Sequence, residues 1–279
     1  MQLHDSATDH VKVRTAVLLA AGLGSRLAPL TDAVPKCLVA VNGVPIVERL
    51  VRALDAHGFR RLVIVTGYKA ETIRDYLGER FGGIAVEYVV SPCFETTNNI
   101  YSLWLVRRLI DEPFLLVESD VVLDQQLLAP LLEPGRIAVS PQLPWMNGTT
   151  VTLDGDGNVN AFFPPPGIYG HHCTDAGHFM AVNICSLARD TWREVGERLD
   201  SHVAAGQTSL FYESVFEEMT AAGSMAPAAV IFPAERWYEI DTPADLKAAE
   251  LVFPRRLYPA RTWRPAPAAE VARSAGAAV

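Results

Sequence analysis

Two glycines, a serine and two cations lie close together near the start of the chain. In the segment VLLAAGLGSRLAPLTDAVPK, an apolar run leads directly into Gly22, Gly24, Ser25 and Arg26, and Lys36 closes the segment. Glycine lets the backbone turn tightly and approach a ligand, because it has no Cβ. Successive backbone N–H groups in such a turn form an anion-binding concavity, and an arginine fork suits phosphate oxygens. We therefore predict a loop that wraps a triphosphate, with Arg26 and Lys36 neutralising its charge.

Two better-known phosphate-binding loops do not fit this stretch. The spacing G-x-x-x-x-G-K-[ST] of a P-loop is absent. The dinucleotide fingerprint G-x-G-x-x-G also fails, because Leu27 stands where its third glycine would be. No acidic residue follows the apolar run 62–66. A nicotinamide-dependent oxidoreductase is therefore disfavoured.

Two aspartates follow apolar runs much later in the chain. Asp120 comes after FLLVES, and Asp241 comes after WYEI. Two carboxylates at one sheet edge can hold Mg²⁺, which binds through one or two carboxylates and substrate phosphates. Either residue could instead cap a helix, above all Asp241, which precedes Thr242-Pro243. We predict Asp120 and Asp241 as metal ligands and keep capping as the alternative.

A third group of residues could bind the second substrate. Aromatic rings and carboxylates together suit an ammonium group, and large aromatic residues can equally build the core. The candidates for this acceptor pocket are Trp145, Asn183, Tyr212, Glu213, Trp237 and Glu239. The pair His171-His172 lacks the second ligand pair of a zinc site, so we expect a polar loop that could touch an anion.

These residues need a sheet that brings them together. Buried strands are predicted over 15–20, 62–66, 85–90 and 114–118, and helices over 46–57, 70–77 and from Thr97 or Asn98 to Leu109. This alternation predicts an α/β, Rossmann-like doubly wound sheet. Ligands in such sheets lie beyond the carboxyl ends of the strands, so Gly22, Gly67 and Asp120 should share one edge.

The pattern changes after about residue 141. DGDGN at 154–158 predicts a hairpin between strands 149–153 and 159–163. A strand over 179–184, helices over 187–205 and 211–222, a strand over 229–232 and a last helix to Val252 follow. The sheet is therefore expected to be mixed, with a small acceptor-binding hairpin and helix region at about 141–232. We predict one domain over 13–253, a flexible leader at 1–12 and a flexible Ala/Pro/Arg tail at 254–279.

The composition narrows the class of protein. The net charge of −8 argues against a nucleic-acid binder. Four cysteines without a C-x-x-C pair favour a reduced, cytoplasmic compartment. No apolar run is long enough for a membrane span, and the first residues lack a signal-peptide core. The oligomeric state stays open, a homodimer included.

Taken whole, the sequence resembles the sugar-nucleotide pyrophosphorylase superfamily of nucleotidyltransferases. The string LAAGLGSRLAPLTDAVPKCL is typical of the superfamily, whereas TTNNIYSLWL and RWYEID resemble the branch of bacterial choline-phosphate and phosphonate cytidylyltransferases. The resemblance implies transfer of CMP from CTP to a small phosphorylated or phosphonate acceptor, with release of pyrophosphate and Mg²⁺ at Asp120 and Asp241. It implies that Arg26 and Lys36 serve catalysis, and that the nucleotide contacts are Leu19, Ala20, Ala21, Gly22, Gly24, Ser25, Arg26, Lys36, Gly67, Tyr68, Thr97, Asn98, Asn99 and Ser102.

One departure leaves the acceptor open. Relatives often carry a lysine in the loop after the hairpin, but here that loop reads FPPPG. His171-His172 could replace it, or the acceptor could differ. A sugar-1-phosphate nucleotidyltransferase using UTP, dTTP or GTP is one alternative, which TTNNIYSL argues against. A non-catalytic nucleotide-binding regulator is the other, although Lys36 and both aspartates are present.

Overall fold

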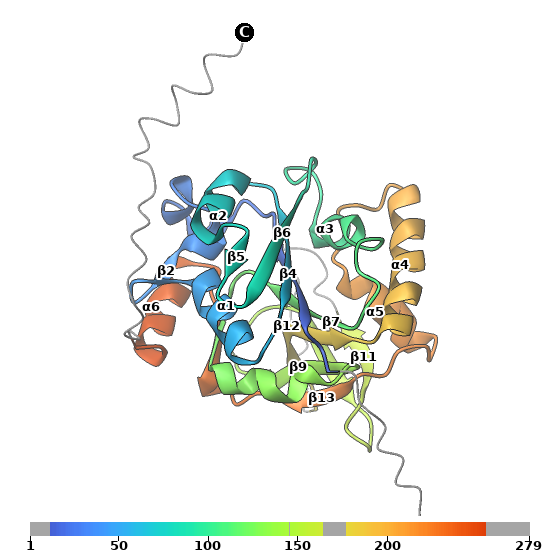
Figure 1. Cartoon of the computed structure of the whole chain (residues 1–279). Coiled ribbons are helices and arrows are strands. Elements are labelled where there is room, and N and C mark those ends of the chain that lie inside the picture. The colour runs from blue at the N-terminus through green and yellow to red at the C-terminus, as the bar shows by residue number, and fades with distance from the viewer. Residues whose placement is uncertain (1–11, 145, 164–176, 255–279) are drawn as a thin grey trace, which may run out of the picture.

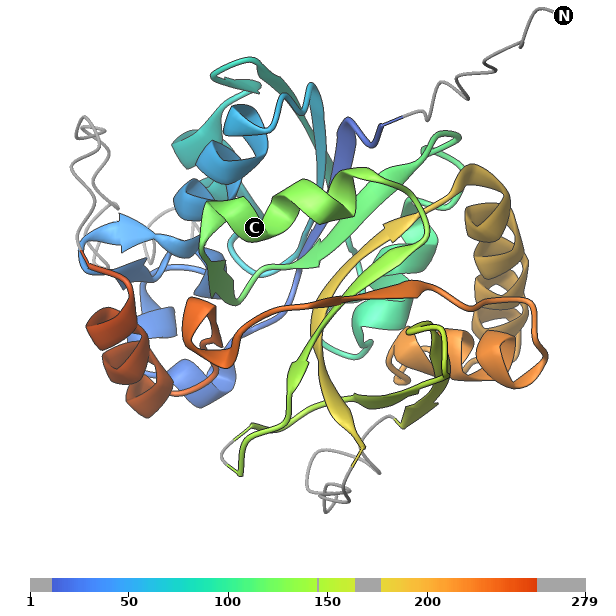
Figure 2. The same ribbon diagram turned by 90° about the horizontal axis from the view of Figure 1, so that it is seen from below.

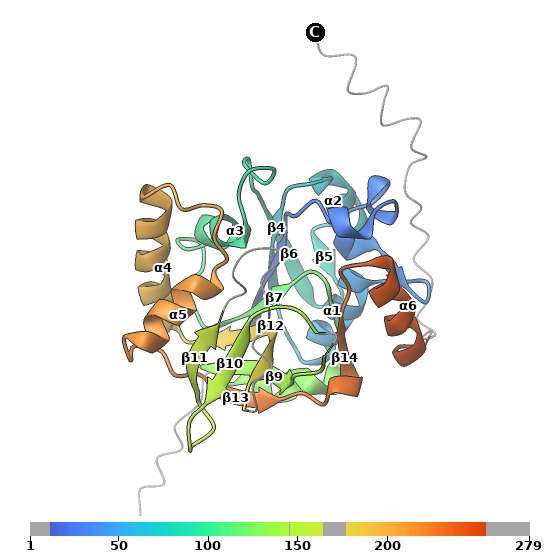
Figure 3. The same ribbon diagram turned by 180° about the vertical axis from the view of Figure 1, so that it is seen from behind.

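A mixed sheet with helices on both faces forms the centre of the molecule (Figure 1). The computed structural model describes residues 12–144, 146–163 and 177–254. Within these ranges eight strands follow one another in the order β11-β10-β12-β7-β1-β4-β6-β5, and β9 joins β12 to β13. Helices α3, α4 and α5 lie on one side of this sheet, and α1, α2 and α6 lie on the other (Figure 3). The predicted α/β class and mixed sheet are confirmed.

The first half of the sheet is parallel where the apolar runs predicted it. Its strands are β1 (Thr15–Ala20), β4 (Arg61–Thr66), β6 (Ile84–Val90) and β7 (Phe114–Glu118). β1 is the middle strand, so that Leu18 is paired with Ile64 of β4 and with Val117 of β7. All three of these side chains are fully buried. A short strand β5 (Arg80–Phe81) closes the edge beside β6.

The helices of this half differ from expectation in two places. α1 (Ile46–Ala56) and α2 (Ala70–Leu77) match their predicted ranges closely, but α3 (Asn99–Leu105) stops before Leu109. Asn98 is its N-cap, and its side chain accepts the N–H of Asn99. The segment Gln125–Leu132 is a 3₁₀ helix. Pro130 lies inside it and has no N–H to give to an α-helical hydrogen bond.

The second half of the sheet is built mainly from antiparallel pairs. Its strands are β9 (Arg136–Pro141), β10 (Thr150–Leu153), β11 (Val159–Phe163), β12 (Phe179–Leu187) and β13 (Ala228–Ile231). β10 and β11 form the predicted hairpin, and Asp154 accepts the N–H groups of Asp156 and Asn158 in its turn. β12 runs three residues beyond its predicted end and pairs antiparallel with β7. This pairing joins the two halves into one sheet.

Helices complete the second half. α4 (Arg189–Ala204) and α5 (Glu213–Ala221) pack against each other, and α4 also contacts α3. α6 (Pro243–Val252) begins with a capping box between Thr242 and Asp245, and it lies beside β2 (Ala40–Val41), which pairs with β3 (Val44–Pro45) (Figure 2). No helix in the described ranges is long and apolar enough to cross a bilayer. Apart from Lys12 and Pro254, the predicted leader and tail lie outside those ranges.

Candidate active site

A cavity of about 390 Å³ lies beyond the carboxyl ends of β1 and β7. The loop after β1, the start of α3 and the residues that follow β7 form its walls. All residues predicted to contact the nucleotide line it, except Gly67 and Tyr68: Leu19, Ala20, Ala21, Gly22, Gly24, Ser25, Arg26, Lys36, Thr97, Asn98, Asn99 and Ser102. The residues that the sequence singled out for a triphosphate therefore face one space.

The loop after β1 needs glycine at one position and leaves room at another. Gly24 has φ +64°, and a Cβ there would lie 3.0 Å from carbon atoms of both Lys36 and Thr31. Its carbonyl accepts hydrogen bonds from the Leu27 N–H and the Thr31 hydroxyl. A Cβ on Gly22 would meet no atom within 4 Å. Gly24 is thus required for the turn. Gly22 has no side chain and leaves open space in this part of the cavity.

Gly67 and Tyr68 support this loop from the neighbouring strand. Tyr68 donates its backbone N–H to the carbonyl of Ala21 over 3.1 Å, and its hydroxyl donates to the carbonyl of Thr31. A Cβ on Gly67 would lie 2.7 Å from that same Ala21 oxygen and 2.6 Å from the Cβ of Phe94. The structure therefore places both residues beside the loop and not in the wall of the cavity.

Asp120 and Asp241 meet because two short strands pair. β8 (Val121–Leu123) runs antiparallel to β14 (Trp237–Glu239), and the backbone N–H of Ile240 donates to the carbonyl of Asp120. This pairing brings a residue near the end of the described chain next to the end of β7. The predicted alternative, that Asp241 caps α6, does not hold, because the side chain of Thr242 caps it.

Lys36 lies between the two aspartates. Its Nζ is 2.7 Å from Oδ2 of Asp120 and 2.6 Å from Oδ1 of Asp241. Arg26 reaches the same Asp241 oxygen over 2.9 Å. Burial disfavours the charged ammonium, but the two carboxylates outweigh that penalty and raise the pKa of Lys36. The four residues predicted to carry catalysis therefore form one charged cluster.

The chemistry of this cluster fits a hard divalent cation. Carboxylate oxygens of Asp120, Asp241 and Glu239 lie within 4.8 Å of one another. Asp120 is 8% exposed, and its Oδ1 has no hydrogen-bond partner among the described residues. A buried carboxylate oxygen without a partner is costly, and a metal ion would satisfy it. Mg²⁺ takes oxygen ligands of this kind.

Glu118 is a residue of the cavity wall that the sequence analysis missed. It ends β7, lines the cavity and accepts a 2.9 Å hydrogen bond from Nδ2 of Asn99. Its position could have revealed it, because Glu118 ends the apolar run of β7 and so lies at the same carboxyl edge of the sheet as Asp120. Phe94 and Phe211 also line the cavity and were not predicted.

The acidic residues of this region shift one another's titration. Burial raises the pKa of Glu118 and Glu239, and neighbouring carboxylates add to the shift. Burial likewise raises the pKa of Glu213 to about 7, with Asp120 adding to it. Among the described residues, five carboxyl groups (Glu118, Asp120, Glu213, Glu239 and Asp241) thus lie near two cations, Lys36 and Arg26. The cluster favours a further positive charge.

The predicted acceptor residues are only partly brought together. Tyr212 and Trp237 are each 2% exposed, and they pack in different core clusters. They therefore do not form an aromatic cage with each other. Asn183 has φ +58° and lies at an irregularity of β12. It directly precedes Ile184, which is paired with Val117 of β7. Trp145 and the histidines at 171 and 172 lie outside the described residues.

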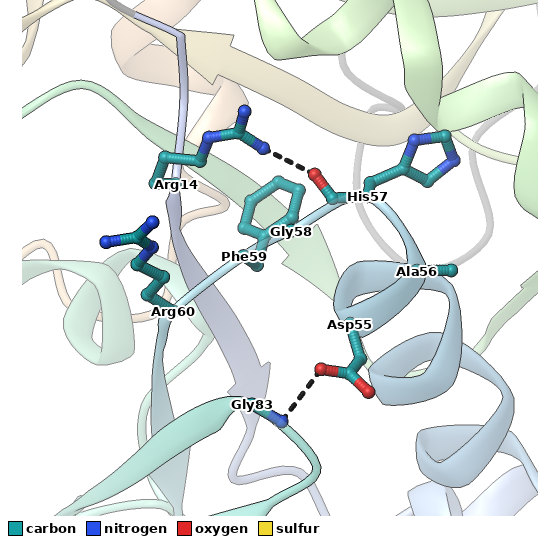
Figure 4. A pocket seen from close by; sticks show the side chains of 8 residues that line it. All are labelled: Arg14, Asp55, Ala56, His57, Gly58, Phe59, Arg60 and Gly83. Atoms are coloured by element: carbon teal, nitrogen blue, oxygen red, sulfur yellow. Dashed lines mark hydrogen bonds between the residues drawn. The ribbon is translucent and has the colours of Figure 1, made fainter.

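A second hollow, of about 490 Å³, lies at the opposite end of β1 (Figure 4). Arg14 and Arg60, which precede β1 and β4, line it together with the turn after α1. Arg14 donates to the carbonyl of His57, and the Gly83 N–H donates to the carboxylate of Asp55. None of the described residues that were predicted to act on a substrate lines this hollow. We therefore place the candidate active site at the carboxyl ends of the strands.

Comparison with known proteins covers the segment that supplies the glycine loop, Lys36 and Asp120. Residues 15–133 match the family model named nucleotidyl transferase. A CMP-5'-(3-aminopropyl)phosphonate synthase of Streptomyces rubellomurinus is 34% identical over 255 residues, which cover 88% of this chain and 39% of the relative. A 2-aminoethylphosphonate cytidylyltransferase of Lancefieldella rimae is 37% identical over 117 residues, or 41% of this chain and 46% of the relative.

The choline-phosphate cytidylyltransferase of Streptococcus pneumoniae is 42% identical over 93 residues, which cover 33% of this chain and 39% of the relative. The chain thus spans less than half the length of each of these curated relatives. Among solved structures, the CTP:phosphocholine cytidylyltransferase of S. pneumoniae has a TM-score of 0.74 at 23% identity, covering 87% of this chain and 99% of that chain.

The inositol-1-phosphate CTP transferase of T. maritima has a TM-score of 0.68, also at 23% identity, over 86% of this chain and 95% of that one. At this level of identity the two structures support the fold. Together with the family model and the curated relatives, they confirm the predicted resemblance: residues 15–133 carry the nucleotidyl transferase pattern, and the cavity is built around it.

Proposed function

We propose that the protein is a Mg²⁺-dependent cytidylyltransferase that transfers CMP from CTP to a small phosphorylated or phosphonate acceptor. The observation that carries this proposal is the position of Lys36, which contacts Asp120 and Asp241 in the cavity that the glycine loop also lines. A loop for phosphates, two cations and a pair of carboxylates are the groups that nucleotidyl transfer requires. The curated relatives whose names mention CMP or cytidylyl transfer support cytidine as the base.

The reaction would need no covalent intermediate on the protein. An oxygen of the acceptor's phosphate or phosphonate attacks the α-phosphorus of CTP, a new P–O bond forms, and the bond to the β-phosphate breaks to release pyrophosphate. Such a transfer depends on positioning and on neutralising charge. The acceptor oxygen is already anionic, so the chain need not supply a strong base.

Each group of the cluster has a role in this scheme. The loop of Gly22 to Arg26 would hold the triphosphate, and Lys36 would neutralise charge that develops at the α-phosphorus. Asp120 and Asp241 would hold Mg²⁺, which would lower the charge repulsion between nucleotide and acceptor. Arg26 is well exposed, with 62% of its side chain accessible, and can follow the phosphates.

The acceptor is proposed to carry an amine. The cavity and its surroundings hold an excess of carboxyl groups over cations. Phosphocholine, 2-aminoethylphosphonate and 3-aminopropylphosphonate, the compounds in the names of three relatives, all combine a phosphorus group with an amine or quaternary ammonium. Glu213 and Glu239, predicted for this subsite, remain the proposed partners of the amine, and Glu118 joins them.

Pyrophosphate release tests this function. The purified chain is incubated with Mg²⁺ and CTP and, in parallel, with phosphocholine, 2-aminoethylphosphonate, 3-aminopropylphosphonate or the amine-free 2-hydroxyethylphosphonate. We expect release with an amine-bearing acceptor and loss of release when Mg²⁺ is chelated. Release unaffected by chelation would contradict the metal assignment.

A sugar-1-phosphate nucleotidyltransferase is the second candidate. A UTP–glucose-1-phosphate uridylyltransferase of Haloferax volcanii is 37% identical over 112 residues, covering 40% of this chain. Parallel reactions with UTP, dTTP or GTP and glucose 1-phosphate decide between the two. If no pyrophosphate is released with CTP and any of its acceptors, but is released with a sugar phosphate, this alternative is favoured. If no reaction releases pyrophosphate, a nucleotide-binding regulator is favoured.

A further inference from the structure

Asn99 connects three elements that meet at the cavity. It is the first residue of α3, and both ends of its side-chain amide are engaged by protein groups. Nδ2 donates to Oε1 of Glu118 over 2.9 Å, and Oδ1 accepts the backbone N–H of Tyr212 over 2.9 Å. Glu118 ends β7, and Tyr212 directly precedes α5. One amide therefore ties α3 to β7 and to α5.

The residue before it strengthens this connection. Asn98 donates its backbone N–H to the carbonyl of Thr208 over 2.8 Å, and its side chain reaches the carbonyl of Ser209 at 3.4 Å. The segment 98–99 is thus joined to the segment 208–212 at several points. That second segment belongs to the region 141–232, which the sequence analysis assigned to the acceptor.

The charge around Asn99 explains why an asparagine is needed. Its neighbours Glu118 and Glu213 are both acidic, and the Glu213 carboxyl has one oxygen that is buried without a partner among the described residues. An amide can donate to a carboxylate and accept a backbone N–H at once, whereas an ionised carboxylate can only accept. An aspartate of the same shape would place a third carboxyl group against the other two.

We infer that Asn99 is a positioning residue for the acceptor: it holds Glu118 and the start of α5, with Glu213 at its first turn, in place around the acceptor's amine. This inference rests on the proposed function, and it moves Asn99 from the nucleotide contacts to the acceptor side. The contacts that its amide makes in the structure are to protein groups on the acceptor side, Glu118 and the backbone N–H of Tyr212.

A reciprocal exchange of the two side chains tests the inference. Asn99→Asp removes the donor to Glu118, and we expect the KM of an amine-bearing acceptor to rise about tenfold while the KM of CTP changes less than about twofold. Adding Glu118→Gln returns an amide and a carboxylate to the contact in reversed order. The double variant is therefore expected to recover thermal stability that Asn99→Asp loses, by about 4 °C.

The control is Asn160→Asp, which makes the same chemical change at an exposed residue of β11 that does not line the cavity; Oδ1 of Asn160 accepts from the Thr152 hydroxyl. It should leave both KM values unchanged. A rise in the KM of CTP that equals or exceeds the rise for the acceptor would make Asn99 a nucleotide contact and overturn the inference. The inference would also be overturned if the unfolding temperature of the double variant were no higher than the sum of the effects of Asn99→Asp and Glu118→Gln predicts.

The two measurements also separate this inference from the proposed function. If the unmodified chain releases no pyrophosphate with any CTP acceptor, the proposed function fails and the acceptor role of Asn99 fails with it. If release is normal but Asn99→Asp shows no split between the two KM values, the inference alone fails. The stability comparison does not depend on turnover and decides whether Asn99 and Glu118 are coupled.

Discussion

The two halves of the sheet contribute different groups to the candidate site. The parallel half, β1 with β4, β6 and β7, leads at its carboxyl ends into the glycine loop with Arg26, Lys36 and the start of α3. The antiparallel half, joined through β12, adds Glu213 at the start of α5. The parallel half offers the cations and backbone N–H groups, beside the carboxyl groups of Glu118 and Asp120, and the antiparallel half adds a further buried carboxyl group. This difference suits a polyanionic substrate on one side and a cationic group on the other.

The halves also differ in how well the neighbouring sequence predicts the position of their functional residues. In the parallel half the chemistry-bearing residues directly follow apolar strands, and Gly24 needs its positive φ for the turn. In the antiparallel half, Asn183 has its unusual φ at an irregularity of a strand and Glu213 depends on where α5 begins. The family model correspondingly matches residues 15–133 and not the second half. Variants of Lys36 in the parallel half and of Glu213 in the antiparallel half should therefore affect different substrates.

Asp120→Asn should have the largest effect, because Asp120 is a ligand of the proposed metal site, which both substrates would share. The kcat is expected to fall about 10³-fold or more, since a bound metal ion contributes several kcal/mol to stabilising the transition state. Steady-state pyrophosphate release measures it, and the thermal unfolding temperature should stay close to that of the unmodified chain. Asp156→Asn at the exposed hairpin tip is the matched control. Near-normal turnover would remove Asp120 from the metal site.

Lys36→Ala should have the next largest effect and should fall on the nucleotide side. Removing one preorganised charge near the α-phosphorus should lower kcat by about 10²-fold. The KM of the acceptor should change little, because Lys36 contacts the aspartates and the glycine loop, not α5. Lys36→Arg, which keeps the charge, should recover part of the rate. An effect confined to the acceptor KM would contradict the division between the halves.

The sequence predicted most of the parallel half because its signals are short in range. Apolar runs located β1 and β7, and the string around Gly22 to Lys36 located the glycine loop that lines the cavity. The meeting of Asp120 with Asp241 was predicted only from strand ends, and it depends on the pairing of β8 with β14, which no local pattern reveals. The role of Tyr212 could not be predicted, because an aromatic residue in an apolar helix pattern fits a core as well as a pocket.

Glu213→Gln tests the acidic half. We expect the KM of an amine-bearing acceptor to rise about tenfold at pH 8, because a contact between ammonium and carboxylate is lost. Burial raises the pKa of Glu213 from its ordinary 4.5 to about 7. The carboxyl is therefore charged in the folded protein only above about pH 7, and the acceptor KM of the unmodified chain should fall as the pH rises through that value.

The same shift has a consequence for stability. Between about pH 4.5 and 7 the folded protein keeps a proton on Glu213 that the unfolded chain has lost. The free energy of unfolding should therefore decrease as the pH rises through this window, and Glu213→Gln should weaken that decrease. The acceptor 2-hydroxyethylphosphonate, run at each pH, corrects for titration of the phosphonate. An unchanged KM for every amine-bearing acceptor would remove Glu213 from the amine subsite.

Gly67→Ala should have the smallest effect and should act on the nucleotide half through its support. The added Cβ would lie 2.6 Å from the Cβ of Phe94 and 2.7 Å from the carbonyl oxygen of Ala21, so the loops after β1 and β4 must move apart. Overpacking of this kind costs about 1–3 kcal/mol, which corresponds to a fall of about 2–10 °C in the unfolding temperature for a chain of this size. Because Ala21 and Phe94 both line the cavity, the KM of CTP should rise a few-fold while the acceptor KM stays within error.

Gly155→Ala at the hairpin tip, where a Cβ meets no atom within 4 Å, is the matched control. Equal changes in both KM values would mean that the two halves move together and that the division between them is structural only.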